Sequence, residues 1–185
     1  MGTTLQETPS GNRLHIGIFG KTNSGKSAFI NAFSGQSVSI VADVKGTTTD
    51  PVYKAMEIAP LGPCVLIDTA GFDDEGELGA MRMEKTALAA QKTELALILF
   101  TSEDLEKELE WFRYFQEKKT PVIPVISKSD LRSEEENQEF AEKLREQTKE
   151  KVCIVSAKTG AGIAELKERM IRMVPEGFGS RTITG

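Results

Sequence analysis

A glycine-rich stretch near the start of the chain combines residue types that bind phosphate. The sequence GKTNSGKS matches the spacing G-x-x-x-x-G-K-[ST] with Gly20, Gly25, Lys26 and Ser27. Glycines let backbone N–H groups turn towards phosphate oxygens, and the positive end of a following helix adds to the attraction. The lysine reaches the outer phosphates, and the serine hydroxyl can ligate Mg²⁺. The pattern therefore predicts a nucleotide site.

Two later motifs indicate which base is bound. SKSD at 127–130 follows an apolar run, which places Asp130 at the carboxyl edge of a sheet. A carboxylate accepts from both N1–H and the 2-amino group of guanine, whereas adenine offers neither donor. SAK at 156–158 supplies the Ala157 N–H for the guanine 6-oxygen, and Lys128 can lay its stem over the base. In this order behind a phosphate loop, the motifs predict guanine.

Two more motifs are typical of loops that respond to a third phosphate. DTAG at 68–71 ends an apolar run, so Asp68 can hold a water bound to Mg²⁺ and the Gly71 N–H can meet the γ-phosphate. GTTTD at 46–50 lies in the long segment after the first helix, where a threonine must close over Mg²⁺ in the triphosphate state. Loops that order around phosphate and relax after hydrolysis predict a molecular switch.

These motifs must be positioned by a sheet whose strands end at one edge. Most of the apolar runs are continuous, as in parallel strands covered on both faces, and they predict strands at 13–19, 51–58, 63–68, 95–101, 121–127 and 152–155. Helical spacing predicts one helix capped by Ser102, another opened by a Ser133–Glu136 capping box, and a last one that carries Ile163 and Met173. The alternation predicts a three-layer α/β fold: a mostly parallel six-stranded sheet with helices on both faces.

Composition sets the wider limits. We expect one domain at 13–174, a polar N-terminal tail at 1–12, and a C-terminal tail or linker at 175–185. The net charge of -5 argues against unassisted nucleic-acid binding. Both cysteines lie in apolar runs, which predicts buried thiols. The lack of a leader or membrane-spanning run favours the cytoplasm.

At this point residues 13–174 resemble a translation-factor-class GTPase. Within that class the chain is similar to the potassium-activated group because of Asn23 in the phosphate loop, the G-T-T motif at 46–48, and Phe72 where signalling GTPases keep a catalytic glutamine. The wording GTTTDPVYK at 46–54 most resembles the FeFe-hydrogenase maturation GTPase (HydF). One departure is Ser127, which stands where this class has asparagine and predicts weaker nucleotide binding through its shorter reach.

The resemblance implies a role for each matching position. Catalysis is assigned to Lys26, Thr48, Gly71 and Glu77, although Asp74 and Glu75 are also candidates for the general base. The nucleotide ligands are Asn23, Ser24, Gly25, Lys26, Ser27, Ala28, Thr47, Thr48, Asp68, Gly71, Lys128, Asp130, Ser156, Ala157 and Lys158. Mg²⁺ is assigned to Ser27, Thr48 and Asp68, and K⁺ to Asn23, Thr47, Ala42 and Val44.

The implied activity is Mg²⁺-dependent, K⁺-activated GTP hydrolysis that gates assembly of the hydrogenase cofactor. We expect homodimers through the switch face, and hydrogenase or maturation proteins reached through further domains that these residues do not contain. Two alternatives stay open. One is the same chemistry in tRNA modification or ribosome assembly, and the other is a nucleotide-responsive binding module with negligible turnover.

Overall fold

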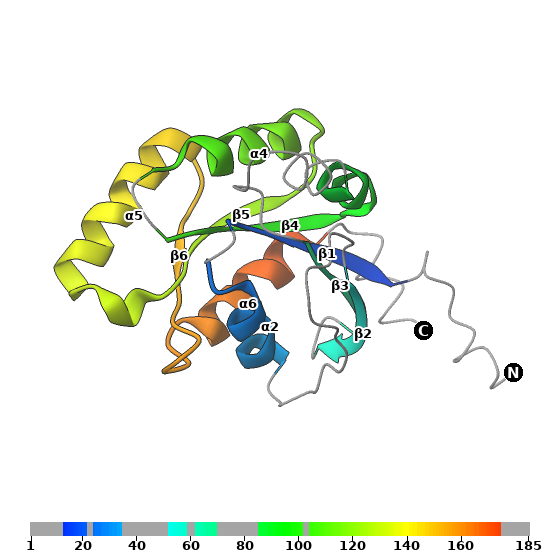
Figure 1. Ribbon diagram of the computed structural model, residues 1–185, viewed down its shortest axis with the longest axis horizontal. Coiled ribbons are helices and arrows are strands. Elements are labelled where there is room, and N and C mark those ends of the chain that lie inside the picture. The colour runs from blue at the N-terminus through cyan, green and yellow to red at the C-terminus, as the bar shows by residue number, and fades with distance from the viewer. Residues whose placement is uncertain are drawn as a thin grey trace, which may run out of the picture.

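Six strands form one sheet in the computed structural model, which describes residues 13–21, 24–34, 52–58, 62–69, 85–101 and 104–174. The strand order is β2-β3-β1-β4-β5-β6 (Figure 1). Only β2 runs antiparallel to its neighbour; the other pairs are parallel. The strands are β1 (Leu14–Phe19), β2 (Val52–Ile58), β3 (Gly62–Asp68), β4 (Leu95–Phe100), β5 (Val122–Ile126) and β6 (Cys153–Ile154). The predicted sheet is confirmed.

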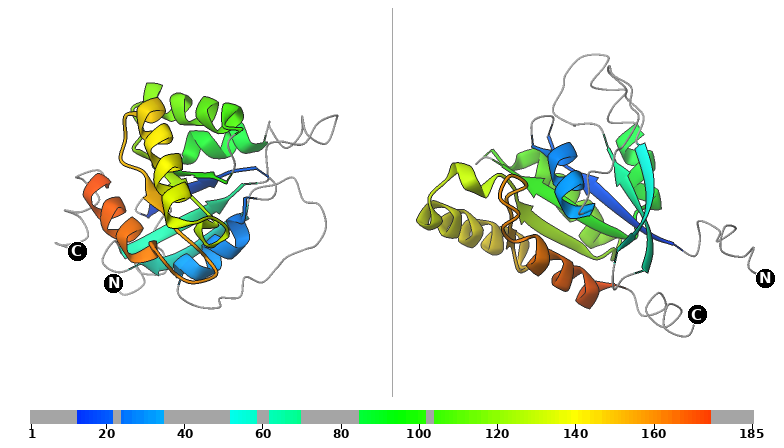
Figure 2. Two further views of the ribbon diagram at one scale, coloured as in Figure 1. Left: turned by 90° about the vertical axis from the view of Figure 1, so that its left-hand side faces the viewer. Right: turned by 90° about the horizontal axis from the view of Figure 1, so that it is seen from below.

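Helices cover both faces of this sheet. One face carries α2 (Lys26–Ser34) and α6 (Ile163–Met173), and the other carries α4 (Glu106–Glu117) and α5 (Glu134–Thr148) (Figure 2). A further helix spans 85–92, and a short 3-10 helix, η2 (Ser129–Leu131), follows β5. None of the helices in the described ranges is long and apolar enough to cross a membrane.

The core explains why these segments form layers. Strands β1, β4 and β5 are apolar on both faces, so each face needs its own covering helices. Under α2 and α6 the core includes Phe29, Phe33 and Leu166, whereas under α4 and α5 it includes Phe112 and Phe115. The predicted three-layer architecture is therefore confirmed.

Two helix starts test the predictions about capping. Ser133 accepts from the Glu136 N–H at 3.1 Å, and the Glu136 carboxylate accepts from the Ser133 N–H at 2.9 Å, which confirms the capping box. The predicted cap at Ser102 is wrong. Helix α4 has Leu105 at its N-cap position with no side-chain cap, and the acidic Glu106 and Glu108 in its first turn complement the helix dipole instead.

The sheet brings the motif-bearing loops to one edge. Strands β2 and β3 lie on one side of β1, and β4, β5 and β6 lie on the other, so the strand order reverses at β1. In open α/β sheets, ligands bind at the carboxyl end of such a switch point. The loop after β1 holds the glycine-rich stretch, and the loops after β3, β5 and β6 hold the other motifs that lie in the described ranges.

The two cysteines bear no sign of chemistry. Cys64 in β3 and Cys153 in β6 are free and buried, as the sequence predicted. Burial raises the pKa of Cys64 to about 12 and also raises the pKa of Cys153. A thiol is a poor nucleophile or metal ligand unless it ionises, so both residues act as core packing.

Candidate functional site

The glycine-rich loop closes tightly over the start of α2. Gly25 has φ 85°, a conformation that favours glycine, and the Phe29 N–H donates to its carbonyl at 2.8 Å. A Cβ on Gly20 would lie 2.5 Å from Ser24 Oγ, so a larger residue at position 20 would force the Ser24 side chain to shift. The loop therefore passes directly into the first turn of a helix, where backbone N–H groups point outward.

Lys26 and Ser27 occupy that first turn. Lys26 is buried, and its Nζ donates to the Gly20 and Lys21 carbonyls, each at 3.2 Å. Its ammonium is thus held over the loop that would wrap the phosphates. Ser27 and Ala28 are exposed next to it, which leaves the Ser27 hydroxyl open to a ligand.

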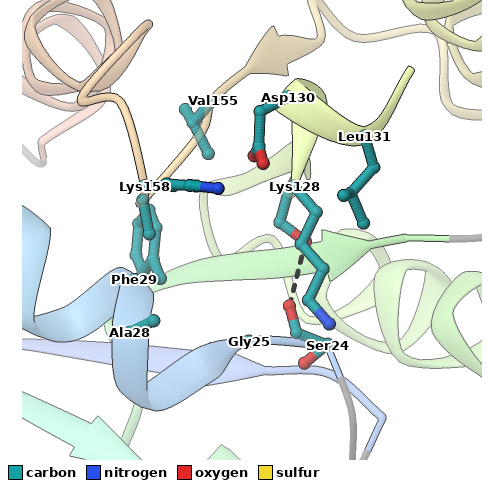
Figure 3. Close-up of a pocket in the computed structure, with 11 residues that line it drawn as sticks. Ser24, Gly25, Ala28, Phe29, Lys128, Asp130, Leu131, Val155 and Lys158 are labelled. Atoms are coloured by element: carbon teal, nitrogen blue, oxygen red, sulfur yellow. Dashed lines mark hydrogen bonds between the residues drawn. The ribbon is translucent and has the colours of Figure 1, made fainter.

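A cavity of about 310 Å³ extends from this loop towards β5 and β6. Two lysines enter it from different loops, Lys128 after β5 and Lys158 after β6 (Figure 3). A Cβ on Gly25 would lie 3.1 Å from Lys128 Cε, so the Lys128 stem crosses the phosphate loop. The cavity lining consists of Ser24, Gly25, Ala28, Phe29, Ser127, Lys128, Asp130, Leu131, Val155, Ala157 and Lys158.

Asp130 presents an ionised carboxylate at this cavity. The side chain is exposed, and Ser156 Oγ donates to Asp130 Oδ1 at 2.7 Å. That hydrogen bond, ahead of smaller effects of Lys158 and Arg132, lowers the pKa of Asp130 below its ordinary value. Ser156 is itself oriented because its Oγ accepts from the Thr159 N–H at 3.1 Å. The structure therefore brings the SKSD and SAK motifs together.

Ser127 links the two halves of the site. Its Oγ is buried and donates to the Ser24 carbonyl at 3.0 Å, which joins the loop after β5 to the phosphate loop (Figure 3). The short side chain reaches because the two loops lie in contact. The expectation of weaker nucleotide binding rested on the shorter reach of serine; the hydrogen bond shows that Ser127 does reach the phosphate loop, and the effect on affinity stays a prediction.

Asp68 ends β3 on the other side of β1. Burial raises the pKa of Asp68, and the positive charges of Lys26 and Lys54 oppose that rise. Lys54 Nζ lies 3.9 Å from Asp68 Oδ2. The following Thr69 is anchored, since its Oγ1 donates to the Ile18 carbonyl at 2.8 Å. A partly desolvated carboxylate near the phosphate loop is suited to a cation.

Several predicted site residues lie outside the described residues, and their positions stay predictions. These are the proposed potassium ligands and switch residues, together with the candidates for the general base: Asn23, Ala42, Val44, Thr47, Thr48, Gly71, Phe72, Asp74, Glu75 and Glu77.

Sequence reasoning missed a connection between the phosphate loop and α4. Lys21 Nζ donates to the Asp104 carbonyl at 2.7 Å and lies 3.5 Å from Glu108 Oε2, a fully buried carboxylate. Next to it, the ring of Phe19 stacks on Trp111 at 5.6 Å between centroids. The sequence signal that could have indicated this contact is the position of Glu108, which falls on the same face of the predicted helix as Leu105 and Phe112.

The sheet order and the glycine-rich loop at its switch point define a P-loop GTPase fold. The chain belongs to the family of 50S ribosome-binding GTPases, which it matches over residues 15–128. Curated proteins similar to this chain are themselves named as GTPases.

Two curated relatives illustrate this relationship. GTPase Der of Wolinella succinogenes is 34% identical over 192 residues, and the tRNA modification GTPase MnmE of Endomicrobium trichonymphae is 31% identical over 166 residues. These matches cover 97% and 86% of this chain but only 39% and 35% of the relatives. The chain thus spans less than half of their length.

Solved structures agree on the fold. Era of Aquifex aeolicus, crystallised with GDP.AlF4-, superposes with a TM-score of 0.73 at 24% identity and covers 88% of this chain and 57% of that one. The cytosolic domain of the iron transporter FeoB of T. maritima superposes with a TM-score of 0.64 at 22% identity, over 86% of this chain and 63% of that one.

Proposed function

We propose that this chain is the GTP-binding and GTP-hydrolysing switch domain of a larger protein, with specificity for guanine. The observation that carries the proposal is the Asp130 carboxylate, held by Ser156 at one end of a cavity that reaches the phosphate loop at the other. A nucleotide laid along this cavity meets an acceptor at its base and N–H donors with a lysine at its phosphates.

The base end discriminates through hydrogen-bond polarity. With its pKa lowered, Asp130 stays an acceptor throughout the neutral range, and guanine offers it two donors. Adenine would place an acceptor against the carboxylate and leave it without a partner, which costs far more than a missing contact. The Ala157 N–H, in the loop after β6, is available for the 6-oxygen.

The phosphate end fits magnesium. The Ser27 hydroxyl is exposed in the first turn of α2, and Asp68 is a partly desolvated carboxylate on the adjacent strand. Oxygen donors of this kind are those that Mg²⁺ prefers, with phosphate oxygens and waters as its other ligands. When bound, the ion would neutralise charge that develops on the phosphates. The Lys26 ammonium could exchange its hydrogen bonds to the Gly20 and Lys21 carbonyls for hydrogen bonds to the outer phosphates.

Potassium activation is part of the proposal. Phe72 cannot orient water through a hydrogen bond, and no arginine occurs in residues 20–27 or 36–54 to supply positive charge in cis. The Asn23 carbonyl, with carbonyls from the segment around Ala42 and Val44, would suit a weakly hydrated monovalent cation. The positive charge of such a cation would stabilise the transition state of phosphoryl transfer.

For the cellular process we propose assembly of the FeFe-hydrogenase cofactor, on the basis of the sequence GTTTDPVYK at 46–54. Relatives named for tRNA modification favour RNA modification or ribosome assembly as the second candidate. Activation of a hydrogenase by the full-length protein should then depend on whether GTP or GDP is bound to it. If hydrogenase activation is the same with GTP and with GDP while tRNA modification differs between them, a role in RNA modification replaces the role in hydrogenase assembly.

Exchange of the carboxylate tests guanine recognition. In Asp130→Asn the amide donates where the carboxylate accepted, so binding should shift from GDP towards XDP, whose 2-oxygen is an acceptor. Fluorescent-nucleotide titration of both variants with GDP, XDP and ADP measures this. Glu146→Gln, the same carboxylate-to-amide change at an exposed position on α5 outside the cavity, is the matched control and should keep wild-type preference. An Asp130→Asn variant that still prefers GDP contradicts the assignment.

A further inference from the structure

The loop that carries Asp130 contains an unfavourable backbone conformation. Lys128 has φ 57°, in the left-handed region that residues with a Cβ rarely adopt. Such a residue persists only where surrounding contacts over-determine it. Backbone hydrogen bonds that hold this loop include the Leu131 N–H to the Lys128 carbonyl at 3.1 Å and the Ser129 N–H to the carbonyl of Val155, just after β6, at 3.0 Å.

Arg132 supplies contacts from outside the loop. Its Nη2 donates to the Thr101 carbonyl at 2.7 Å, its Nη1 donates to Asn137 Oδ1 at 3.0 Å, and both reach the Ser127 carbonyl at 3.5 Å. The guanidinium also lies over the Phe140 ring at 5.0 Å. The planar Arg132 guanidinium therefore links the ends of β4 and β5 to the start of α5.

Asn137 completes this connection. The side chain is 7% exposed, accepts from Arg132 through Oδ1, and donates through Nδ2 to the Ser129 carbonyl at 3.0 Å. Both ends of the amide are thus used, one on Arg132 and one on the loop itself. Its position is fixed by α5, because its own N–H donates to the Ser133 carbonyl at 3.0 Å.

We propose that Arg132, acting with Asn137, is a positioning residue that sets guanine specificity by holding the Lys128–Asp130 loop. The inference rests on the proposed guanine site and goes beyond it, since neither side chain lines the cavity. The loop needs such a support because the Ser127 hydroxyl can donate only one hydrogen bond, and it donates that bond to the Ser24 carbonyl in the phosphate loop. The outer side of the base loop is therefore held by Arg132 and Asn137.

The test compares GDP with IDP, which lacks the 2-amino group and so loses one hydrogen bond to Asp130. Arg132→Ala should weaken GDP binding by about tenfold and should shrink the GDP-to-IDP affinity ratio by at least about threefold, because a displaced carboxylate no longer senses the amino group. Arg132→Lys keeps the charge but loses the fork, and should lie between Ala and wild type. Arg145→Ala, the same change at an exposed position on α5, should leave the ratio unchanged.

Thermal unfolding and the affinity ratio together separate the outcomes. A lower Tm with an unchanged GDP-to-IDP ratio overturns the proposal, because a purely structural residue would weaken both nucleotides equally or neither. If Arg132→Ala does not fold, Arg132→Lys decides: a wild-type ratio overturns the proposal and a reduced ratio supports it. In a double-mutant cycle with Asn137→Ala, additive losses in the ratio contradict joint action. Failure of the wild-type chain to bind GDP would instead overturn the proposed function beneath it.

Discussion

Removal of one hydroxyl should disturb both nucleotide-binding loops at once. Ser127→Ala deletes the 3.0 Å hydrogen bond that the buried Ser127 hydroxyl donates to the carbonyl of the fully buried Ser24. A buried acceptor left without its partner costs about 1–3 kcal/mol. Because both loops contact the same nucleotide in the proposed site, part of this cost should appear in binding. About 1.4 kcal/mol corresponds to tenfold, so we expect GDP affinity to fall by about tenfold.

A matched variant separates affinity from stability. Thr148 Oγ1 is also a buried hydroxyl, which donates to the Leu144 carbonyl at 2.8 Å and accepts from the Glu150 N–H at 3.2 Å, but it lies at the far end of α5. Thr148→Ala should therefore lower the free energy of unfolding by a similar amount and leave GDP affinity unchanged. Calorimetric titration with GDP and urea unfolding of both variants measure the two effects. If Ser127→Ala loses stability as Thr148→Ala does but keeps its GDP affinity, the two loops are not coupled through this bond.

Three further predictions concern the phosphates, the monovalent cation and α4. Thr48→Ala should spare GDP binding and impair GTP hydrolysis, whereas Lys26→Ala should weaken both nucleotides; equal loss of GDP affinity in the two variants would show that Thr48 is not the switch residue. Hydrolysis should be faster in KCl than in NaCl at equal ionic strength and high protein concentration, and Asn23→Ala should abolish the difference; equal wild-type rates in the two salts contradict the cation site. Burial raises the pKa of Glu108 above its ordinary 4.5, with Lys21 opposing and Asp104 adding to the rise. The folded protein then binds this proton more tightly than the unfolded chain, so the stabilising contribution is present at low pH and is lost as pH rises from about 4.5 through the raised value. Urea unfolding across pH should show wild type losing stability relative to Glu108→Gln over that window, and a constant difference would be contrary to this account.

The sequence was most informative where local chemistry and chain order agree. Apolar runs predicted the five parallel strands to within one residue at each end, because strands that are covered on both faces need nearly continuous apolar sequence. The antiparallel edge strand β2 was also placed to within one residue, although it carries charged residues and is partly exposed. The Ser133–Glu136 capping box is entirely local and was predicted correctly. At the site, the structure places the glycine-rich loop and Asp130 at one cavity, as the order of the motifs predicted, and their roles toward a nucleotide stay predictions.

Contacts between distant segments could not be predicted in this way. Ser127 was judged on side-chain length, but its reach depends on how closely the loop after β5 approaches the phosphate loop, which only the packed sheet determines. Arg132 belongs to none of the motifs in the sequence. Its role depends on the Thr101 carbonyl, 31 residues away along the chain. The start of α4 was predicted from the capping preference of serine at position 102, but the observed N-cap is Leu105, three residues later, and it makes no side-chain cap.

Single-turnover hydrolysis of GTP and ATP tests the central claim most directly. The wild-type chain would be mixed in excess with each radiolabelled triphosphate, with Mg²⁺ and K⁺ present, and phosphate release would be followed over time. Lys26→Ala serves as the control for a contaminating activity. The account predicts that GTP is hydrolysed by the wild type, that excess unlabelled GDP blocks the reaction, and that ATP is neither cleaved nor able to compete. Cleavage of ATP at a rate similar to that of GTP, or no cleavage of GTP at all, would contradict a guanine-specific GTPase switch.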